Sequence, residues 1–269
     1  MIYNRQRGVS KYDHVLNGDI SFSTPLKSIQ GVFEDVALTE SAKIKKKDVS
    51  NSRYFAGTYG NKNQKFKEEI VETCIKMNIP KDAIEKLEAI EKVDQFYVGV
   101  DGEERRPSYR VYWGSFDKDT SVGNGSAIVW QEGSKNFKVR EYAGYPIDNI
   151  GELKKRSMAV LRGDKKLNDL IFEFLLCGIT EKEFLEKTNS VISLDKSGEK
   201  RNTIDVSLDY MGRSVVKLKK EILNLLDYFK ISHRDRLHFF FPPTESMTLS
   251  RVQWGTDSDG QKFINIYYI

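Results

Sequence analysis

The sequence has little of what marks disulfide-rich or metal-binding proteins. Only two cysteines, Cys74 and Cys177, occur in 269 residues, and the three histidines are His14, His233 and His238. None of these residues stands at the spacing of a zinc site. We therefore expect reduced, buried thiols and no metal centre built from these side chains.

Long apolar runs and a strong net charge are also missing. No apolar stretch approaches the length of a membrane helix, and the N-terminus lacks the apolar segment of a signal peptide. Lysine and arginine number 43 against 39 acidic residues, and the one dense basic run holds Lys43, Lys45, Lys46 and Lys47. Such a run is typical of a solvated loop. These features predict a cytoplasmic protein that binds neither nucleic acid nor membrane.

No stretch rich in glycine, serine or proline divides the chain. The periodic segments follow one another with short turn signals between them. A chain of 269 residues with 39% hydrophobic residues can bury one large core. We predict a single domain over 1–269, with an irregular lead-in over 1–50 and regular structure over 51–269.

Hydrophobic periodicity predicts hairpins with helices between them. Helical spacing is clear around 66–77, 84–91, 167–175 and 222–229, with Gly178 as a C-terminal cap. Strands are expected over 53–59, 96–100, 109–113, 127–131, 137–142, 190–194, 203–209, 214–219, 237–241, 251–255 and 263–269. The fold class is therefore α/β of the α+β type, built from antiparallel hairpins separated by helices.

Charged and aromatic side chains gather on one face of several strands, because side chains alternate across a sheet. That face carries Arg110, Tyr112, Lys138, Arg140, Tyr142, Asp205, Ser207, Asp209, Lys217, Lys219, Asn265 and Tyr267. A sheet closed into a barrel would turn this face inward and cover its apolar face with helices. An open sheet with one solvated face explains the same alternation.

A basic, tyrosine-lined interior suits the chemistry of allylic diphosphates. Arginine and lysine neutralise a departing diphosphate, and tyrosine rings shield an allylic carbocation with their electron-rich faces. The cations also stabilise the charge that develops as the diphosphate leaves.

Three segments resemble one enzyme family. Residues 96–113, which contain Asp101 and Gly102, look like the Asp-Gly hairpin of aromatic prenyltransferases with the αββα barrel. Residues 205–219 resemble the later hairpin of that family, in which a strand ends in a basic or amide residue that faces the lumen. Residues 264–269 are similar to the last strand of the smaller bacterial members, including those that modify cyclic peptides.

The resemblance implies a closed, helix-wrapped barrel of the ABBA type, usually built from five αββα units, of which four hairpins are recognisable here. It implies that Arg110, Lys217 and Arg251 bind the diphosphate, and that Tyr112 and Tyr267 act as catalytic shields of the carbocation. The strand faces add Lys138, Arg140 and Lys219 to the diphosphate site and Tyr142 to the lumen.

The expected function is that of a prenyltransferase, which moves a dimethylallyl or geranyl group from its diphosphate to an aromatic or peptide acceptor. No cofactor is expected to be required, and Mg²⁺ is compatible with the reaction. Two alternatives stay open. One is a noncatalytic binding module that presents the polar face to a peptide, glycan or nucleic-acid strand, and the other is an enzyme acting on a different phosphorylated substrate. No residue is assigned as a general base.

Overall fold

The computed structural model describes ten segments of the chain. They cover residues 37–59, 64–90, 95–101, 108–117, 122–144, 148–188, 190–191, 202–208, 211–240 and 247–269. All statements about the structure concern these residues.

The ten described strands form one antiparallel sheet. They are β1 (Ala37–Lys45), β2 (Asp48–Tyr59), β3 (Gln95–Asp101), β4 (Ser108–Asp117), β5 (Val122–Gln131), β6 (Phe137–Gly144), β7 (Ser190–Val191), β8 (Asn202–Ser207), β9 (Leu249–Thr256) and β10 (Lys262–Tyr268). Their order across the sheet is β6-β5-β4-β3-β2-β1-β10-β9-β8-β7. The first and last described strands, β1 and β10, therefore pair in the middle of the sheet, where Glu40 lies opposite Tyr268.

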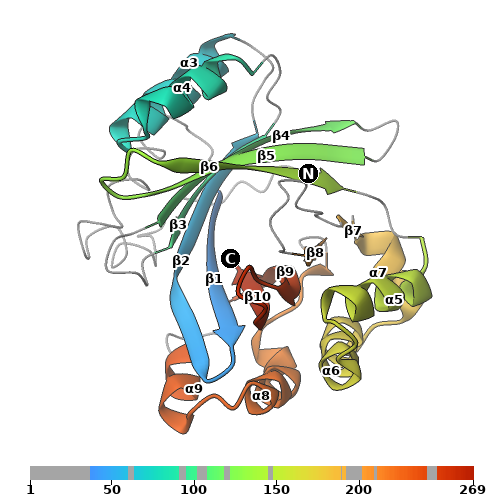
Figure 1. Cartoon of the computed structure of the whole chain (residues 1–269). Coiled ribbons are helices and arrows are strands. Elements are labelled where there is room, and N and C mark those ends of the chain that lie inside the picture. The colour runs from blue at the N-terminus through green and yellow to red at the C-terminus, as the bar shows by residue number, and fades with distance from the viewer. Residues whose placement is uncertain are drawn as a thin grey trace.

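The sheet curls until its two edges approach each other. The edge strands β6 and β7 are in contact, although no hydrogen-bonded pairing joins them in the described residues. Figure 1 shows the strands changing direction steadily from β1 to β6, with β8, β9 and β10 facing them. This curled antiparallel sheet with its helices confirms the predicted α/β fold of antiparallel hairpins and helices. Its curl is consistent with the predicted helix-wrapped barrel, which we call the PT barrel.

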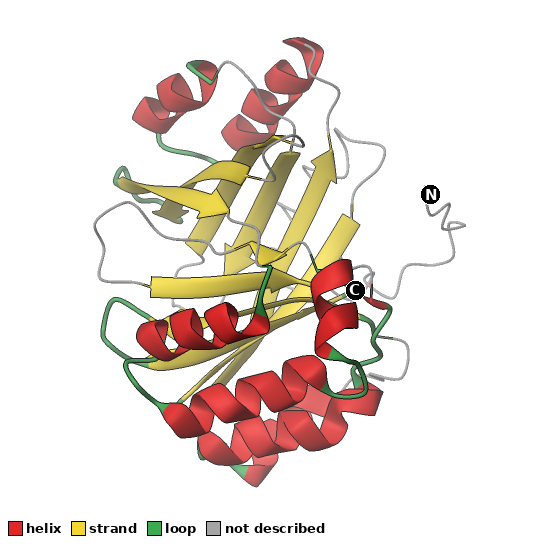
Figure 2. Cartoon of the chain, turned by 90° about the vertical axis from the view of Figure 1, so that its right-hand side faces the viewer, coloured by secondary structure: helices red, strands yellow, loops and turns green. Residues whose placement is uncertain are grey.

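The described helices lie in three connections between strands. They are α3 (Gln64–Lys76) and α4 (Lys81–Glu88) after β2, then α5 (Ile150–Val160), α6 (Lys165–Leu176) and α7 (Glu181–Lys187) after β6, and finally the 3-10 turn η2 (Val216–Leu218) with α8 (Lys219–Tyr228) and α9 (His233–Phe240) after β8. Figure 2 shows α3 and α4 at one end of the sheet and the other helices at the opposite end. No described helix is long and apolar enough to cross a membrane.

Side-chain caps explain where several helices begin. The Asn149 side chain accepts hydrogen bonds from the backbone N–H groups of Gly151 and Glu152 at the start of α5. At α7, Thr180 and Glu183 form a reciprocal capping box. Each cap satisfies N–H groups that have no partner within the helix.

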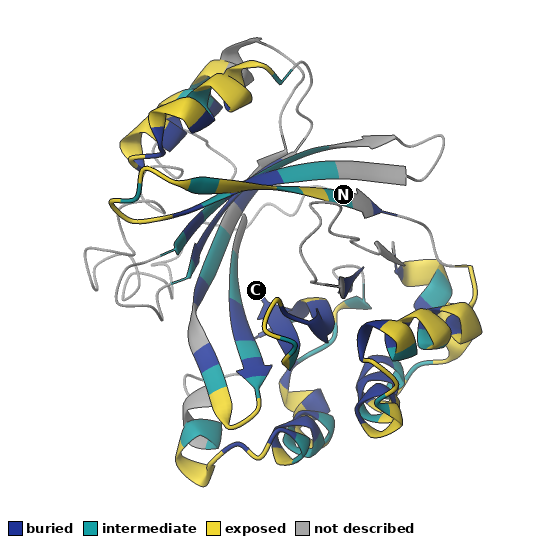
Figure 3. Ribbon diagram, in the orientation of Figure 1, coloured by how far each residue is buried: buried dark blue, intermediate teal, exposed yellow. Residues whose placement is uncertain are grey.

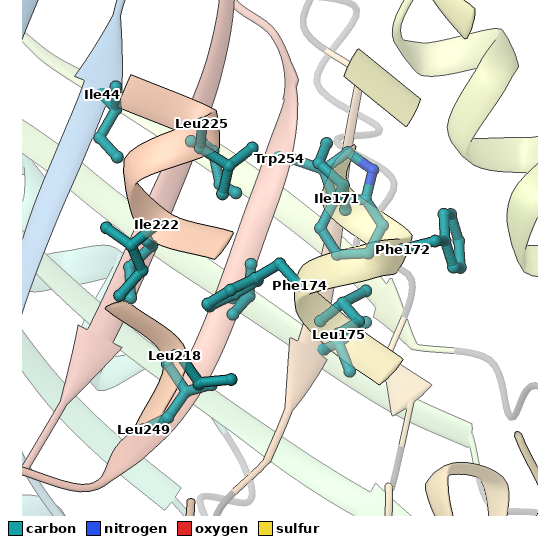
Figure 4. Close-up of a cluster of buried hydrophobic side chains, with 14 of the residues drawn as sticks. Ile44, Ile171, Phe172, Phe174, Leu175, Leu218, Ile222, Leu225, Leu249 and Trp254 are labelled. Carbon is teal, nitrogen blue, oxygen red and sulfur yellow. The ribbon is translucent and has the colours of Figure 1, made fainter. Parts of the chain in front are cut away.

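The larger hydrophobic cluster lies between the C-terminal half of the sheet and helices α5 to α8. Alternate residues of β8, β9 and β10, such as Val206, Trp254 and Ile266, are fully buried against these helices. Figure 4 shows Trp254 of this cluster beside Ile171 of α6. The Trp254 Nε1–H donates a 2.8 Å hydrogen bond to Ser157 Oγ of α5, so the polar atom of the buried indole is satisfied.

A second cluster lies between β3, β4 and β5 and helices α3 and α4. It includes Cys74, Leu87, Val98, Val111 and Ile128, all at most 1% exposed. Figure 3 shows the helices buried toward the sheet and exposed on their far side. Both clusters lie on the same, helix-covered side of the sheet. We call the opposite side of the sheet the inner face.

One strand was not predicted, and the next begins earlier than the sequence predicts. The irregular lead-in predicted over 1–50 is wrong from Ala37 onward, because β1 and the start of β2 lie there, whereas residues 1–36 lie outside the described part. The polar side chains Ser41 and Lys43 made β1 look like a loop, but they occupy the inner face of a strand. Together β1 and β2 form an antiparallel hairpin that was not predicted. The single-domain assignment stays a prediction.

Two predicted strands are helical instead. Residues 216–218 form η2 and Lys219 starts α8. Ser214 forms an isolated bridge with Thr248, and the Val215 N–H donates to Met247 O. The predicted strand at 237–241 is helix α9 as far as Phe240, and residue 241 lies outside the described part. The other predicted strands each overlap a strand of the sheet, although 192–194 and 209 lie outside the described residues.

Candidate functional site

The register of the sheet assigns each predicted site residue to a face. Val111 of β4 packs in the second cluster, so its neighbours Arg110 and Tyr112 point to the inner face. The pairing continues this face through β5 to Lys138, Arg140 and Tyr142 of β6. On the other half of the sheet it includes Arg251 of β9 and Tyr267 of β10. Seven of the nine predicted residues thus share one face.

Lys217 and Lys219 do not belong to this face. Both are exposed, one on η2 and the other at the first position of α8. Their neighbour Leu218 is buried in the larger cluster, on the helix-covered side of the sheet. The prediction that these lysines line the interior is wrong, because it rested on a strand that the chain does not form.

A buried ion-pair cluster stands at the centre of the inner face. Arg53 of β2, only 1% exposed, donates from Nε to Asp101 Oδ2 of β3 at 3.1 Å. Arg110 Nη2 approaches the same carboxylate oxygen at 3.3 Å. Asp101 therefore holds two guanidinium groups side by side, which would otherwise repel each other in a poorly solvated place.

Amide side chains extend this cluster across the seam of the sheet. Arg53 Nη1 donates to Asn265 Oδ1 of β10 at 3.0 Å, and Asn265 Nδ2 donates to Gln253 Oε1 of β9 at 2.7 Å. Farther along, Arg251 lies 3.3 Å from Asp205 of β8. The linked side chains thus cross the inner face from β4 to β9, and a separate ion pair joins β9 to β8.

Some buried polar atoms of this face have no hydrogen-bond partner among the described residues. They are Arg110 Nε, Ser41 Oγ and Ser50 Oγ. A buried donor without a partner costs free energy, and buried polar groups are nearly always satisfied by protein, water or ligand. The inner face therefore retains hydrogen-bonding capacity for a polar molecule.

Four aromatic rings form a chain over the same face. Phe55 of β2 lies 6.0 Å from Tyr112 and 5.5 Å from Tyr267 between ring centroids, and Tyr112 lies 6.1 Å from Tyr142. The Arg53 guanidinium lies 5.9 Å from the Phe55 centroid. Rings and guanidinium groups are therefore interleaved, an arrangement that holds a cation against ring faces and an anion against arginine.

Glycines make room for these rings. A Cβ atom on Gly99 would lie 2.5 Å from Phe55 Cε1, and one on Gly57 would lie 2.0 Å from Tyr97 Cδ1. No side chain fits in either place without displacing the neighbouring ring. The Phe55 and Tyr97 rings therefore each occupy the space beside a glycine of the adjacent strand.

The pKa values of the two predicted tyrosines are shifted in opposite directions. Burial raises the pKa of Tyr112, but the charge of Arg110, a hydrogen bond from it and the charges of Arg53 and Arg140 outweigh burial, so this pKa is lowered. Burial dominates at Tyr267 and raises its pKa. The pKa of Asp101 is lowered despite burial, because Arg53 and Arg110 stabilise its charged form.

Arg53, Phe55, Asp101 and Asn265 are site residues that received no role from the sequence. The alternation Arg53, Phe55, Gly57 lay within a predicted strand and has the same polar-aromatic pattern as the recognised strands. Asp101 was read as part of a turn, although it is the last residue of β3.

Comparison with known proteins identifies the fold. No family model matches the chain, and no curated protein matches it. Among solved structures, AnaPT from Neosartorya fischeri is similar with a TM-score of 0.50 and 9% sequence identity, over 86% of this chain and 77% of that one. The likeness shows a distant relationship in fold, that of the PT barrel.

Proposed function

We propose that this protein transfers a prenyl group from a prenyl diphosphate to an aromatic or peptide acceptor. The observation that carries the proposal is the inner face, on which arginines and aromatic rings alternate over neighbouring strands. The PT-barrel fold, shared with the aromatic prenyltransferase AnaPT, agrees with it.

Arginine side chains are proposed to hold the diphosphate. Arg53, Arg110, Arg140 and Arg251 share the inner face with two carboxylates, Asp101 and Asp205, so positive charge is in excess there. A guanidinium group binds phosphate oxygens in a planar fork and stays charged at every physiological pH. As the C–O bond breaks, the same groups stabilise the charge gained by the leaving diphosphate. Mg²⁺ bound to the diphosphate is compatible with this arrangement.

The ring chain is proposed to hold the prenyl group and the acceptor. Tyr112, Tyr142, Tyr267 and Phe55 offer electron-rich faces to an allylic carbocation. Their contacts with one another also keep water away from the cation, which water would otherwise quench. The proposed donors are dimethylallyl and geranyl diphosphate.

Ligand-dependent melting tests this proposal. Dimethylallyl or geranyl diphosphate should raise the melting temperature, because a ligand that binds the native state stabilises it by about 2.7 kcal/mol at 100 times its Kd. Arg110→Met should weaken this binding about tenfold or more, as expected for a lost charge-assisted hydrogen bond. The control is Lys217→Ala, which removes an exposed cation of η2 and should leave the ligand-dependent shift unchanged.

Incubation with aromatic compounds or tryptophan- and tyrosine-containing peptides completes the test. Mass spectrometry should detect products that have gained one prenyl group. Melting that responds to another phosphorylated compound and to neither prenyl diphosphate would contradict the proposal. Binding of a peptide without any product would instead favour a noncatalytic binding module.

A further inference from the structure

Prenylation of an aromatic ring needs a proton acceptor, because the substituted ring must lose a proton to regain aromaticity. The two carboxylates that the described inner face places among its arginines are poorly suited to this task. Asp101 lies 3.1 Å from Arg53 and 3.3 Å from Arg110, and Asp205 lies 3.3 Å from Arg251. An adjacent guanidinium stabilises the carboxylate and makes it a weaker base.

Tyr112 is the titratable group at the centre of the ring chain. Its ring lies between those of Phe55 and Tyr142. Arg110 lies two residues earlier on the same strand and on the same face, with its Nη2 atom 3.3 Å from Asp101 Oδ2. A nearby guanidinium favours the charged form of a phenol, and a phenol can both donate and accept a proton.

Charged groups face Tyr112 from several neighbouring strands. The charges of Arg53 on β2, Arg110 on β4 and Arg140 on β6 all act on it, and Arg140 lies across Ala127 from Tyr112 on the same face. Asp101 of β3 is engaged with Arg53 and Arg110. In the described part of the chain, the phenols of Tyr142 and Tyr267 are also titratable groups that act on or contact it. Cations thus dominate the surroundings of this hydroxyl, and they stabilise a phenolate there.

We propose that Tyr112 is the acid–base catalyst of the prenyl transfer, a role that rests on the proposed function and extends it. Tyr112 donates its proton to the leaving diphosphate oxygen and later takes the proton that the acceptor ring releases. One residue would thereby serve both proton transfers.

The two steps balance within one turnover. In the first, the prenyl C–O bond breaks, its electron pair stays on the diphosphate oxygen, and the Tyr112 proton moves to that oxygen. The acceptor ring then attacks the allylic cation and forms the new C–C bond. In the second proton transfer, the C–H bond at the substituted ring carbon breaks, its electron pair restores aromaticity, and the proton returns to the Tyr112 phenolate.

Electrostatics at the two tyrosines that touch Phe55 support the choice. Burial raises the pKa of Tyr112, yet Arg110, Arg53 and Arg140 together lower it below the usual value, whereas the pKa of Tyr267 is raised by burial. Tyr112 therefore gives up its proton more readily than Tyr267, although both rings contact the same phenylalanine.

Spectrophotometric titration of tyrosine ionisation tests the assignment without any substrate. The folded wild-type protein should show one phenol that ionises ahead of the others. Tyr112→Phe should remove this early step, and Tyr267→Phe should keep it. Arg110→Met should move the step to higher pH, while Arg110→Lys should keep most of it. An early step that survives in a folded Tyr112→Phe variant would overturn the inference.

Turnover with dimethylallyl diphosphate gives the second readout. Tyr112→Phe should lower kcat by about 100-fold or more, as expected for a lost acid–base group, while the melting shift caused by the diphosphate persists. Because the donating form is the neutral phenol, wild-type kcat should fall as pH rises through the Tyr112 pKa, and the residual activity of the variant should not show this fall.

The outcomes separate the two proposals. A wild-type protein that makes no product from either prenyl diphosphate overturns the proposed function and this role with it. A wild-type protein that turns over normally, with a Tyr112→Phe variant that matches its kcat and alkaline limb, overturns only the role of Tyr112.

Discussion

On the inner face, glycines leave room for the aromatic rings of the neighbouring strands. Gly99 and Gly57 have φ angles outside the left-handed region, so a side chain there would be tolerated by the backbone itself. What excludes it is the ring on the neighbouring strand, at 2.5 Å for Phe55 and 2.0 Å for Tyr97. The two glycines therefore belong to the site even though they carry no functional group.

Gly99→Ala should damage the site more than the fold. The added methyl group must displace the Phe55 ring, which contacts Tyr112 and Tyr267. We expect a loss of about 1–3 kcal/mol in stability, as for other overpacked sites, and a larger relative loss of prenyl diphosphate binding. Urea denaturation and ligand-dependent melting would measure the two effects.

Gly125→Ala is the matched control, since Gly125 shares the inner face and its added Cβ would meet only Trp113 O at 3.5 Å and Tyr142 Cβ at 3.9 Å. Equal damage from both substitutions would show that ring displacement is not the cause.

Residue faces could be predicted wherever a strand was recognised. Arg110, Tyr112, Arg140 and Tyr267 were placed correctly because alternation alone separates the two sides of a strand. Asp101 could not be assigned a role from the sequence. Its importance comes from Arg53, whose strand meets β3 through a connection containing two helices, and no local pattern predicts that pairing.

At the scale of elements, the segment around Leu218 shows how one sequence can satisfy two periods. Val216 and Leu218 alternate with lysines as in a strand, which led to the wrong prediction. Val215, Leu218, Ile222 and Leu225 also follow helical spacing, and all four are buried in the larger cluster. Packing against α6 and the sheet favours the helical solution, and the short alternating stretch carried no information about that packing.

Leu218→Ala should lower the free energy of unfolding much more than Lys217→Ala. Leu218 is 2% exposed and belongs to the larger cluster (Figure 4), so its truncation should cost about 2–5 kcal/mol. Lys217 is exposed, and its replacement should change stability by no more than about 0.5 kcal/mol. Chemical denaturation of both variants measures the difference. A folded Lys217→Ala variant without turnover would show that this lysine reaches the substrate after all.

At the scale of the whole molecule, two separate hydrophobic clusters stabilise two different regions of one sheet. Leu87 of α4 is 1% exposed in the smaller cluster, and Ile266 of β10 is fully buried in the larger one. The smaller cluster draws its residues from one continuous stretch of chain, between α3 and β5. The larger one joins β1 to the segments from α5 to β10.

Leu87→Ala and Ile266→Ala should therefore weaken different regions. Each truncation should cost about 2–5 kcal/mol. Hydrogen exchange should accelerate mainly in α3, α4 and β3–β5 for Leu87→Ala, because those elements can open together as a local unit. For Ile266→Ala it should accelerate throughout the larger cluster and β1. Uniform acceleration in both variants would show that the two clusters unfold as one.

The pairing of β1 with β10 has a consequence for the protein while it is being synthesised. Arg53 and Asn265, which bond across this seam, are 212 positions apart in the sequence. On the ribosome, β1 and β2 emerge long before β10. Until β10 is made, one edge of β1 has unpaired backbone N–H and C=O groups. Such an edge is a template for association with other nascent chains. Lys43 and Lys45 lie in β1 itself and place charge on this strand before β10 is made. Charged side chains on an edge strand disfavour its pairing with a strand of another chain.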